Sequence, residues 1–399
     1  MKRYLFFFLA LVAADVYYTF SKSSSFFLQE SPSLLFANPV QIEKGRKEAD
    51  LFLGPSRTWP DQWREVKGVS VLCFHHIVKD ENFKDADYIA LSESGYRAMM
   101  KWLFDNGYKT ISEDTLIKYL NGEIMPAALP EKPVVLTFDD GYNDFVKYGR
   151  KINLEYKQEV ILFSYPSITL VNKKRAITWN QYKELIREGF TVESHSFWHP
   201  YLNMMEGVDQ GKQLRLSKEV LESHLGIRVE TLAYPYGIYS AESLELLQNN
   251  GYKAAYTTFW GQNIPGTNPY FIQRLIVRKD HTIAQIKKIL ETRILPFQVV
   301  KGYPGMNISM PSTFVLKVPH DVDITRVSLS ARNIFTYVKE KGQFSPLPVV
   351  YDSTSHTITS KISNRKKNVI IQIKYPEAGV EYINNILFNV EGESRPKDK

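Results

Sequence analysis

The 399-residue sequence contains a single cysteine, Cys73, within the apolar run Val-Ser-Val-Leu-Cys-Phe. One cysteine excludes a disulfide bond within the chain, so cysteine content does not indicate the compartment in which the protein works. A lone cysteine in such a run is typical of a buried thiol that packs as a small apolar side chain. Evidence for export must therefore come from the N-terminal sequence.

The N-terminus lacks an apolar run long enough to cross a bilayer comfortably. A short basic start precedes the apolar residues 4–14, whose length suits the core of a signal peptide. The small residues Val-Ala-Ala at positions 12–14 fit a cleavage site. Because apolar residues continue as far as Phe20, a retained anchor is the alternative. We therefore expect residues 1–20 to direct export, as a cleaved signal peptide or as a membrane anchor.

The sequence shows no dense run of lysine and arginine interleaved with aromatic residues, although its formal net charge is +7 and its pI about 9.0. A nucleic-acid partner is therefore not expected. A basic balance of this size fits an anionic envelope polymer or a membrane surface, or serves solubility alone. With 44% hydrophobic and 13% aromatic residues, the chain can bury a sizeable core.

Three changes of pattern divide the chain. Residues 21–65 keep no helical or strand period and are broken by serine and proline, which indicates a linker or a wrap along the surface. In residues 66–300, strand and helix patterns alternate, which predicts an α/β fold with a parallel sheet, a distorted barrel of seven or eight (β/α) units. Residues 301–399 lose the helical period, and we predict a small β-sandwich, an accessory domain for which glycan binding and simple packing remain equally open.

The predicted elements can be placed by residue number. Expected barrel strands lie at residues 69–74, 108–111, 134–138, 160–163, 190–192, 231–234 and 254–258, and expected helices at 92–106, 113–120, 179–188, 214–225 and 241–249. Expected sandwich strands lie at residues 313–318, 327–331, 357–362 and 369–375.

Two adjacent carboxylates, Asp139 and Asp140, follow the strand at residues 134–138. Parallel sheets place their chemistry at the carboxyl ends of strands, so one carboxylate can face a metal while the other takes a proton. Further on, His195 and His199 lie four residues apart and can reach one cation if the segment turns tightly. Asp-Asp-Gly alone is common in solvated turns, and the histidines alone could be partly buried. Together they predict a mononuclear Asp-His-His metal site with a spare aspartate beside it.

Three ordered motifs resemble those of the polysaccharide deacetylases, carbohydrate esterase family four with the NodB-homology fold. These motifs are Thr-Phe-Asp-Asp-Gly at residues 137–141, His-Ser-Phe-Trp-His-Pro at 195–200 and Ala-Tyr-Pro-Tyr-Gly at 233–237. The resemblance covers about residues 66–295. It implies that a divalent metal, zinc being the expected one, is bound by Asp140, His195 and His199.

The same resemblance implies roles for the neighbouring residues. Asp139 would be the general base that activates water, and the Tyr142 backbone amide would stabilise the oxyanion. Trp198 and Tyr236 would pack against a sugar ring, with core packing as the alternative for each. The third motif lacks the arginine that orients the base in many members, and Arg274 is the expected substitute, which we also count among the substrate-binding residues.

The family's last motif, Leu-x-His, supplies the general acid and is absent from residues 270–295, where His281 is a poor match. His75 ends the first predicted strand and offers an answer. If the barrel is circularly permuted, this strand lies beside the last one and brings His75 to the metal. That order resembles the exported poly-N-acetylglucosamine deacetylases of biofilms and implies that His75 is the acid. The adjacent His76 is expected to be structural.

These motifs predict metal-dependent hydrolysis of N-acetyl groups from an N-acetylglucosamine-containing polysaccharide of the cell envelope or biofilm. The expected location is periplasmic, at the cell surface or extracellular. Peptidoglycan and chitin oligosaccharides are alternative substrates, because linkage preference resides in the shapes of loops. A glycan-binding protein without catalysis is the alternative from another class, and the intact aspartates and histidines argue against it.

Overall fold

The computed structural model describes residues 63–172, 174–302, 305, 307–333, 344–363 and 368–390. Residues Gly45–Lys399 form one compact unit, and a second unit, Met1–Lys44, lies wholly outside the described residues. The expected signal or anchor segment, residues 1–20, and the expected linker as far as residue 62 therefore lie outside them as well. Among the described residues, the helices are all too short or too polar to cross a membrane.

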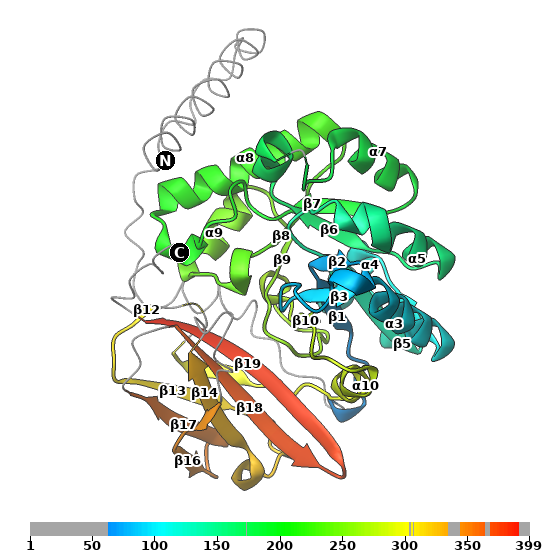
Figure 1. The fold of residues 1–399 in the computed structure, drawn as a ribbon. Helices are drawn as coiled ribbons and strands as arrows, with labels where there is room; N and C mark the ends of the chain where they lie inside the picture. The colour runs from blue at the N-terminus through cyan, green and yellow to red at the C-terminus, as the bar shows by residue number, and fades with distance from the viewer. Residues whose placement is uncertain are drawn as a thin grey trace. The chain divides into compact units, whose positions relative to one another are not determined.

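An eight-stranded parallel sheet forms the first part of the compact unit (Figure 1). Its order is β10-β1-β5-β6-β7-β8-β9, and β4 pairs with the start of β5. A parallel bridge between Tyr256 and Ile272 joins the β9 edge to the segment before β10, so the sheet curls towards closure. The predicted distorted barrel is confirmed. Its strands are β1 (Ser70–Phe74), β4 (Tyr108–Thr110), β5 (Lys132–Phe138), β6 (Ile161–Ser164), β7 (Thr191–Ser194), β8 (Thr231–Ala233), β9 (Ala254–Tyr256) and β10 (Leu275–Ile276).

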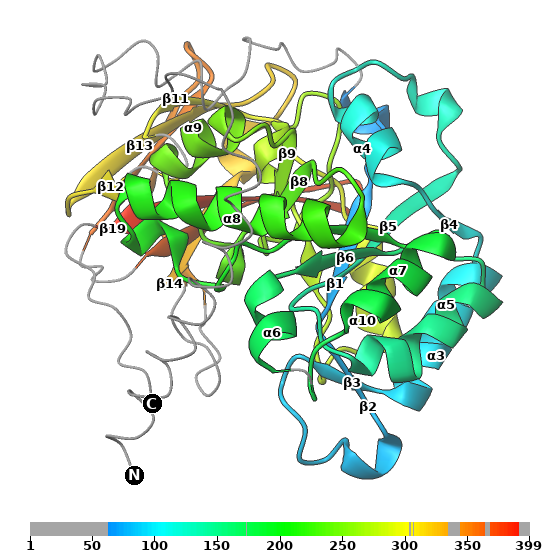
Figure 2. The same cartoon turned by 90° about the horizontal axis from the view of Figure 1, so that it is seen from above.

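Helices surround this sheet (Figure 2). Five of them begin directly after a serine or threonine whose side chain accepts a hydrogen bond from the first turn, which explains where they start. All the predicted helices are present, while α5, α6 and α10 were not predicted, and α8 begins seven residues earlier than expected, in a polar turn. The helices are α3 (Glu93–Asp105), α4 (Glu113–Leu120), α5 (Arg150–Glu155), α6 (Pro166–Val171), α7 (Trp179–Arg187), α8 (Gly207–Leu225), α9 (Ala241–Asn249) and α10 (Ile283–Leu290).

The first strand of the barrel lies between the last strand and the central one. Leu72 of β1 pairs in parallel with Leu275 of β10 on one side and with Leu136 of β5 on the other. This is the neighbourhood that circular permutation predicts. A short parallel pair, β2 (His76–Val78) and β3 (Ala90–Ser92), continues from the end of β1. The end of β1 therefore reaches the same edge of the sheet as the end of β5.

Two further sheets form the predicted β-sandwich. Their orders are β11-β13-β17-β16 and β12-β19-β18-β14-β15, and apolar side chains from both enclose one core. All four predicted sandwich strands are present, but the longest strand, β19, was not predicted. The strands are β11 (Gln298–Lys301), β12 (Asn307–Ile308), β13 (Ser312–Lys317), β14 (Ser328–Asn333), β15 (Ser345–Pro346), β16 (Val349–Asp352), β17 (Thr357–Ile362), β18 (Val369–Glu377) and β19 (Val380–Val390).

The described end of the expected linker packs on the sandwich. Trp63 is buried, its ring meets Tyr382 edge-on at 5.1 Å, and its Nε1 donates to Asp321 at 3.1 Å. Arg64 forms ion pairs with Asp321 and Glu377. These contacts attach Trp63 and Arg64 to the sandwich.

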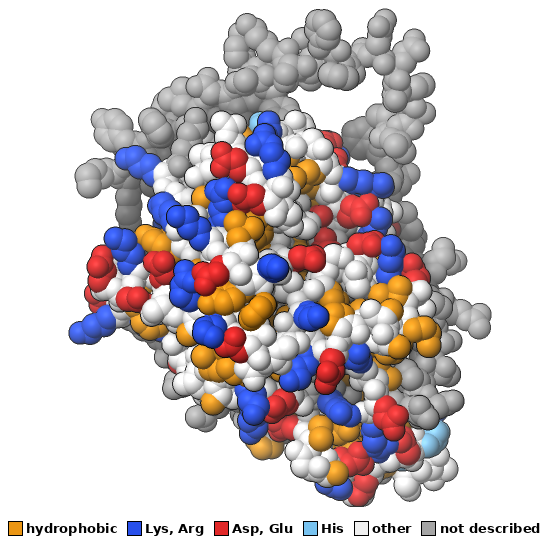
Figure 3. All heavy atoms as spheres, turned by 90° about the vertical axis from the view of Figure 1, so that its right-hand side faces the viewer, with side chains coloured by type: hydrophobic (Ala, Val, Ile, Leu, Met, Phe, Trp, Pro, Cys, Tyr) orange, Lys and Arg blue, Asp and Glu red, His pale blue; other side chains and the backbone are white. Residues whose placement is uncertain are grey.

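Charged side chains of both signs are interspersed on the face shown in Figure 3. That face shows no broad area of lysine and arginine. The net charge of +7 is therefore not gathered into one basic surface there.

Helix α4 closes the interior of the barrel near the start of β5. Its apolar residues Leu116, Tyr119 and Leu120 join the interior cluster of the strands. Its first residue, Glu113, is buried, and its carboxyl group accepts hydrogen bonds from Thr231 Oγ1 at 2.7 Å and Tyr256 Oη at 2.9 Å. Burial raises the pKa of Glu113 to about 7, although these hydrogen bonds act in the opposite direction.

The folded state therefore holds the Glu113 proton more tightly than the unfolded chain does. The stabilisation that follows is complete below about pH 4.5 and is lost as the pH rises towards 7. We predict that Glu113→Gln, which stays neutral and keeps an acceptor for both hydroxyls, makes this loss smaller, while the buried Glu193, whose pKa is also raised by burial and by Glu113, keeps its own part of the pH dependence. Urea unfolding between pH 4.5 and 8 measures it. The control Glu93→Gln, at the same position of α3, should keep the slope of the wild type, and an unchanged slope in Glu113→Gln would contradict the prediction.

Candidate active site

The chain turns sharply where β5 ends, and this turn separates the two aspartates. Asp140 and Gly141 have φ angles of 74° and 69°, in the left-handed region. For aspartate this conformation costs about 1–2 kcal/mol, and such strain is concentrated at functional sites. A Cβ at Gly141 would lie 2.5 Å from Tyr182 Oη, so only glycine fits. As a result, Asp139 contacts Arg274 while Asp140 faces the two histidines of the second motif.

Asp140, His195 and His199 come together as the sequence predicted. Asp140 Oδ1 lies 3.5 Å from His195 Nε2 and 3.4 Å from His199 Nε2, and the three ligand atoms all lie within 4.8 Å of one another. All three side chains are wholly or largely buried. The arrangement is a cluster of one oxygen and two nitrogen donors that could hold a single metal ion.

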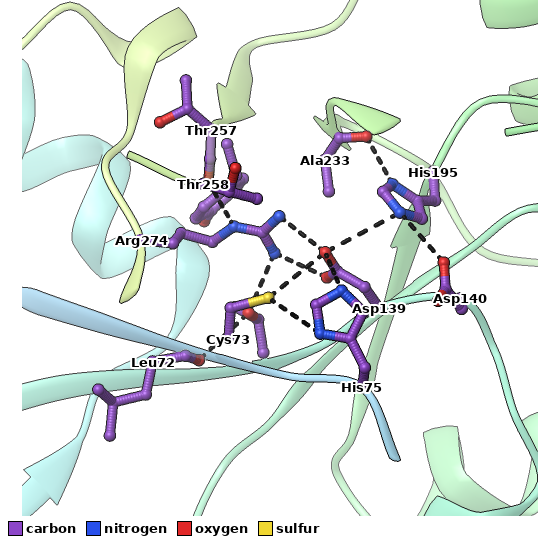
Figure 4. A network of polar contacts seen from close by, with 12 residues as sticks. Leu72, Cys73, His75, Asp139, Asp140, His195, Ala233, Thr257, Thr258 and Arg274 are labelled. Carbon is purple, nitrogen blue, oxygen red and sulfur yellow. Dashed lines mark hydrogen bonds and ion pairs between the residues drawn. The ribbon is translucent and has the colours of Figure 1, made fainter. Parts of the chain in front are cut away.

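His195 is oriented by the neighbouring strand. Its Nδ1 donates to the backbone oxygen of Ala233 at 2.7 Å, and its Nε2 faces Asp140 (Figure 4). The backbone bends back twice after β7, because Ser196 and His199 have φ angles of 61° and 57°. The second bend brings His199 to the same carboxylate. A tight loop, rather than a helix, therefore gathers the two histidines.

Arg274 orients Asp139. Its guanidinium makes two parallel hydrogen bonds to the carboxylate, Nη1 to Oδ1 at 2.7 Å and Nη2 to Oδ2 at 2.8 Å (Figure 4). It also donates to Thr257 O at 2.8 Å and to Thr137 Oγ1 at 3.1 Å. Arg274 is fully buried, so the expectation that it contacts substrate is corrected. Its geometry is that of the substitute for the missing arginine of the third motif.

His75 lies on the other side of Asp139. Its Nε2 is 4.0 Å from Asp139 Oδ2, which is itself 3.9 Å from His195 Nε2. His76 points elsewhere, because its Nδ1 pairs with Asp144 Oδ2 at 2.8 Å and its ring stacks on Tyr142 at 4.2 Å. The structure thus brings His75 to the cluster and leaves His76 beside it. His281, the poor match to the family's last motif, contacts Arg278 instead. Its Nε2 lies 3.2 Å from Arg278 Nη2.

Tyr142, Trp198 and Tyr236 surround the cluster in different ways. Tyr142 and Ala176 face each other in an antiparallel β-bridge. The hydrogen bonds of this bridge are made by the residues before and after them, so the Tyr142 N–H points away from the bridge. Trp198 is 51% exposed and free to meet a ligand with its ring. The Tyr236 ring lies edge-on to His199 at 4.6 Å.

Two residues at the site were missed. Tyr201 stacks on Tyr236 at 3.9 Å, and no part of the second motif pointed to it. Cys73 was expected only to fill space, yet its Sγ lies 3.4 Å from Asp139 Oδ2. The signal for Cys73 was available, because it precedes His75 by two residues, and residues two apart in an extended chain point to the same side.

The charges of the cluster follow from burial and proximity. Burial alone would raise the pKa of Asp139, but Arg274 and the imidazoles outweigh it and hold that pKa below its ordinary value. Burial and the neighbouring His195 lower the pKa of His199 to about 4, so its imidazole is neutral at pH 7. Burial likewise lowers the pKa of His75. His195 differs, because its burial is outweighed by Asp139 and Asp140, which raise its pKa. The cluster therefore presents ionised carboxylates beside the neutral imidazoles of His75 and His199.

Comparison with known proteins agrees with this geometry. The family described as polysaccharide deacetylase matches residues 126–255, which hold all three motifs, and the chain therefore contains a polysaccharide deacetylase domain, that of a hydrolase. Bacillus subtilis (strain 168) YxkH, which carries the name of a polysaccharide deacetylase, is 27% identical over 238 residues, 60% of this chain and 78% of that protein. Streptococcus pyogenes deacetylase PplD, solved in complex with acetate, shares the fold with a TM-score of 0.52 at 22% identity, over 57% of this chain and 99% of that one.

A second relative is named for its substrate. The poly-beta-1,6-N-acetyl-D-glucosamine N-deacetylase of Escherichia coli (strain K12) is 24% identical over 230 residues. The match covers 46% of this chain but only 33% of that protein, so the present chain spans about a third of its length.

Because Asp139 is buried, removing its partner should be costly. We predict that Arg274→Met lowers the free energy of unfolding by about 3–5 kcal/mol, since it leaves a buried carboxylate unpaired. Arg274→Lys should cost less, because it keeps the charge but loses the paired geometry. The control Arg278→Met, at a 36% exposed arginine, should cost less than about 1 kcal/mol. Urea unfolding would contradict this account if Arg274→Met and Arg278→Met were equally stable.

Proposed function

We propose that the protein removes N-acetyl groups from an N-acetylglucosamine-containing polysaccharide in a metal-dependent hydrolysis. One observation carries the proposal: Asp139, fixed by Arg274, lies between the Asp140-His195-His199 cluster and His75. That arrangement offers a base, a metal site and an acid around one point, which is what amide hydrolysis requires.

The donor set fits a zinc-like ion. Nitrogen and oxygen ligands at about 2.0–2.1 Å in a tetrahedron stand about 3.3 Å apart. The distances of 3.4 Å and 3.5 Å from Asp140 Oδ1 to the two Nε2 atoms are close to this spacing. The orientation of His195 by Ala233 also suits a ligand whose Nε2 must carry the lone pair.

The residues of the chain divide the reaction between them. When bound, the metal supplies Lewis-acid chemistry to the acetyl carbonyl and to a water molecule. Asp139 takes the proton of that water as its oxygen attacks the acetyl carbon. The Tyr142 N–H donates to the carbonyl oxygen, on which negative charge develops. The proton taken by Asp139 passes to His75 Nε2, which lies 4.0 Å from Asp139 Oδ2, and His75 delivers it to the leaving nitrogen as the C–N bond breaks. The products are acetate and a free amine.

The substrate class is proposed from the residues around the cluster and from the relatives. Trp198 and Tyr236 present aromatic rings beside His199, and such rings pack well on the apolar face of a sugar. A polymer of N-acetylglucosamine is the substrate in the name of the Escherichia coli relative. The N-terminal sequence, residues 1–20, supports an exported protein that meets this polymer at the cell envelope.

Acetate release tests the reaction and its substrate together. We expect the purified full-length chain to release acetate from poly-N-acetylglucosamine in preference to chitin oligomers and peptidoglycan. Chelation should abolish this activity and added zinc should restore it. Asp139→Asn should lower kcat/KM by about 10²–10⁴-fold, whereas the exposed control Asp209→Asn should not change it. A metal-bound protein that releases no acetate from any of the three polymers would instead be a glycan-binding protein.

The two adjacent histidines provide a matched pair of variants. We predict that His75→Ala lowers kcat by about 10²–10⁴-fold, because the leaving nitrogen loses its proton donor. His76→Ala should retain most of the activity, because His76 contacts Asp144 and Tyr142 rather than Asp139. Steady-state kinetics on the preferred polymer measure both. An active His75→Ala protein together with an inactive His76→Ala protein would reverse the assignment of the acid.

A further inference from the structure

Strand β19 contacts two structures at once. Tyr382, Ile386 and Phe388 on one side belong to the sandwich core, while Leu387 belongs to the large cluster of the barrel. The strand also carries three asparagines, a residue that is uncommon in buried strands. Buried amides are costly unless they are hydrogen-bonded, so the partners of these asparagines indicate what the strand does.

Asn389 is the most buried of the three, at 2% exposure. Its Nδ2 donates to two backbone oxygens, Tyr239 O at 2.9 Å and Gly305 O at 2.8 Å. Its Oδ1 accepts from Asn203 Nδ2 at 3.2 Å. One side chain thus makes three hydrogen bonds to three separate segments, using most of what an amide can offer.

Two of these segments belong to the site. Asn203 follows His199 by four residues, and Tyr239 follows Tyr236 by three. Between these positions the rings of Tyr201 and Tyr236 stack at 3.9 Å with an interplanar angle of 10°. The Tyr236 ring in turn lies edge-on to His199 at 4.6 Å. The amide of Asn389 therefore ties together the segments that place an aromatic wall against one histidine of the cluster.

The same strand also reaches the segment of Arg274. Asn384 Oδ1 accepts from Gln273 Nε2 at 3.0 Å, and Asn384 Nδ2 donates to Leu295 O at 3.2 Å. Gln273 directly precedes Arg274, which holds Asp139. Strand β19 is thus attached to both sides of the site by buried side chains.

We propose that Asn389 is a positioning residue of the site: it clamps the segments after β7 and β8 and so holds Tyr236 against His199. The C-terminal sandwich is then part of the active-site framework rather than an appended module. This inference rests on the proposed metal-dependent deacetylation, but it concerns the position of His199 and can be tested without catalysis.

Zinc titration of the full-length protein gives that test. Asn389→Ala should weaken zinc binding and lower kcat/KM by about tenfold each, since displaced supporting groups change metal sites and catalysis on this scale. The control Asn385→Ala removes an amide of the same strand that donates to Trp260 O, outside the site, and both quantities should stay within about twofold of the wild type. Asn203→Ala removes only the barrel partner and should lower zinc affinity about threefold, which keeps the test available if Asn389→Ala does not fold.

A double-mutant cycle separates positioning from general stability. In a Tyr236→Ala protein, adding Asn389→Ala should change zinc affinity by less than about twofold, because the Tyr236 ring that Asn389 positions has already been removed. Fully additive effects, or a folded Asn389→Ala protein with the zinc affinity of the wild type, would overturn the proposal. If the wild-type protein released no acetate but the variants changed zinc affinity as expected, the proposed deacetylation would be rejected and the positioning role of Asn389 would be supported.

Discussion

The structure depends on the ion pair between Asp139 and Arg274. Both side chains are almost completely buried, and a buried charge persists only when it is paired and hydrogen-bonded. Arg274, which lies near the end of the barrel sequence, meets this requirement. It also donates hydrogen bonds to Thr137 of β5 and to Thr257, which follows β9. It therefore joins the central strand to both sides of the seam between β9 and the segment of β10. The contact that orients Asp139, the proposed base, is therefore also a contact across the seam where the barrel closes. Fold and site are specified by the same few atoms.

Much of the fold could be predicted because local patterns and tertiary structure agree there. The barrel elements alternate clearly, and serine or threonine caps mark most helix starts. Strand β19 escaped prediction because it is buried on both sides, one against the sandwich and one against the barrel, so the usual alternation of apolar and polar residues is lost. Its asparagines also lower its apparent strand propensity. Those residues are explained by contacts with segments more than 80 positions away.

The centre of the candidate site was predictable, but its support was not. Asp139, Asp140, His195 and His199 stand in short motifs whose spacing indicates a common point. His75 could be placed only by assuming which strands are neighbours, and the pairing of β1 with β10 confirms that assumption. Arg274 was expected both to orient Asp139 and to contact substrate, and its complete burial favours the first role. The depth of a side chain depends on how the whole sheet closes, which no local pattern reports.

The pairing of β1 with β10 has a consequence for the order in which the chain is made. His75 directly follows the first barrel strand, whereas the strand that pairs with β1 on one side begins at Leu275, and Asn389 comes later still. During synthesis from the N-terminus, most of the polypeptide must emerge before the first strand finds its second partner. A nascent chain that stops short of Leu275 contains all three recognisable motifs and yet leaves one edge of β1 open. Assembly of the site around His75 therefore has to wait until the chain has been made at least as far as β10, well after the last of the three motifs.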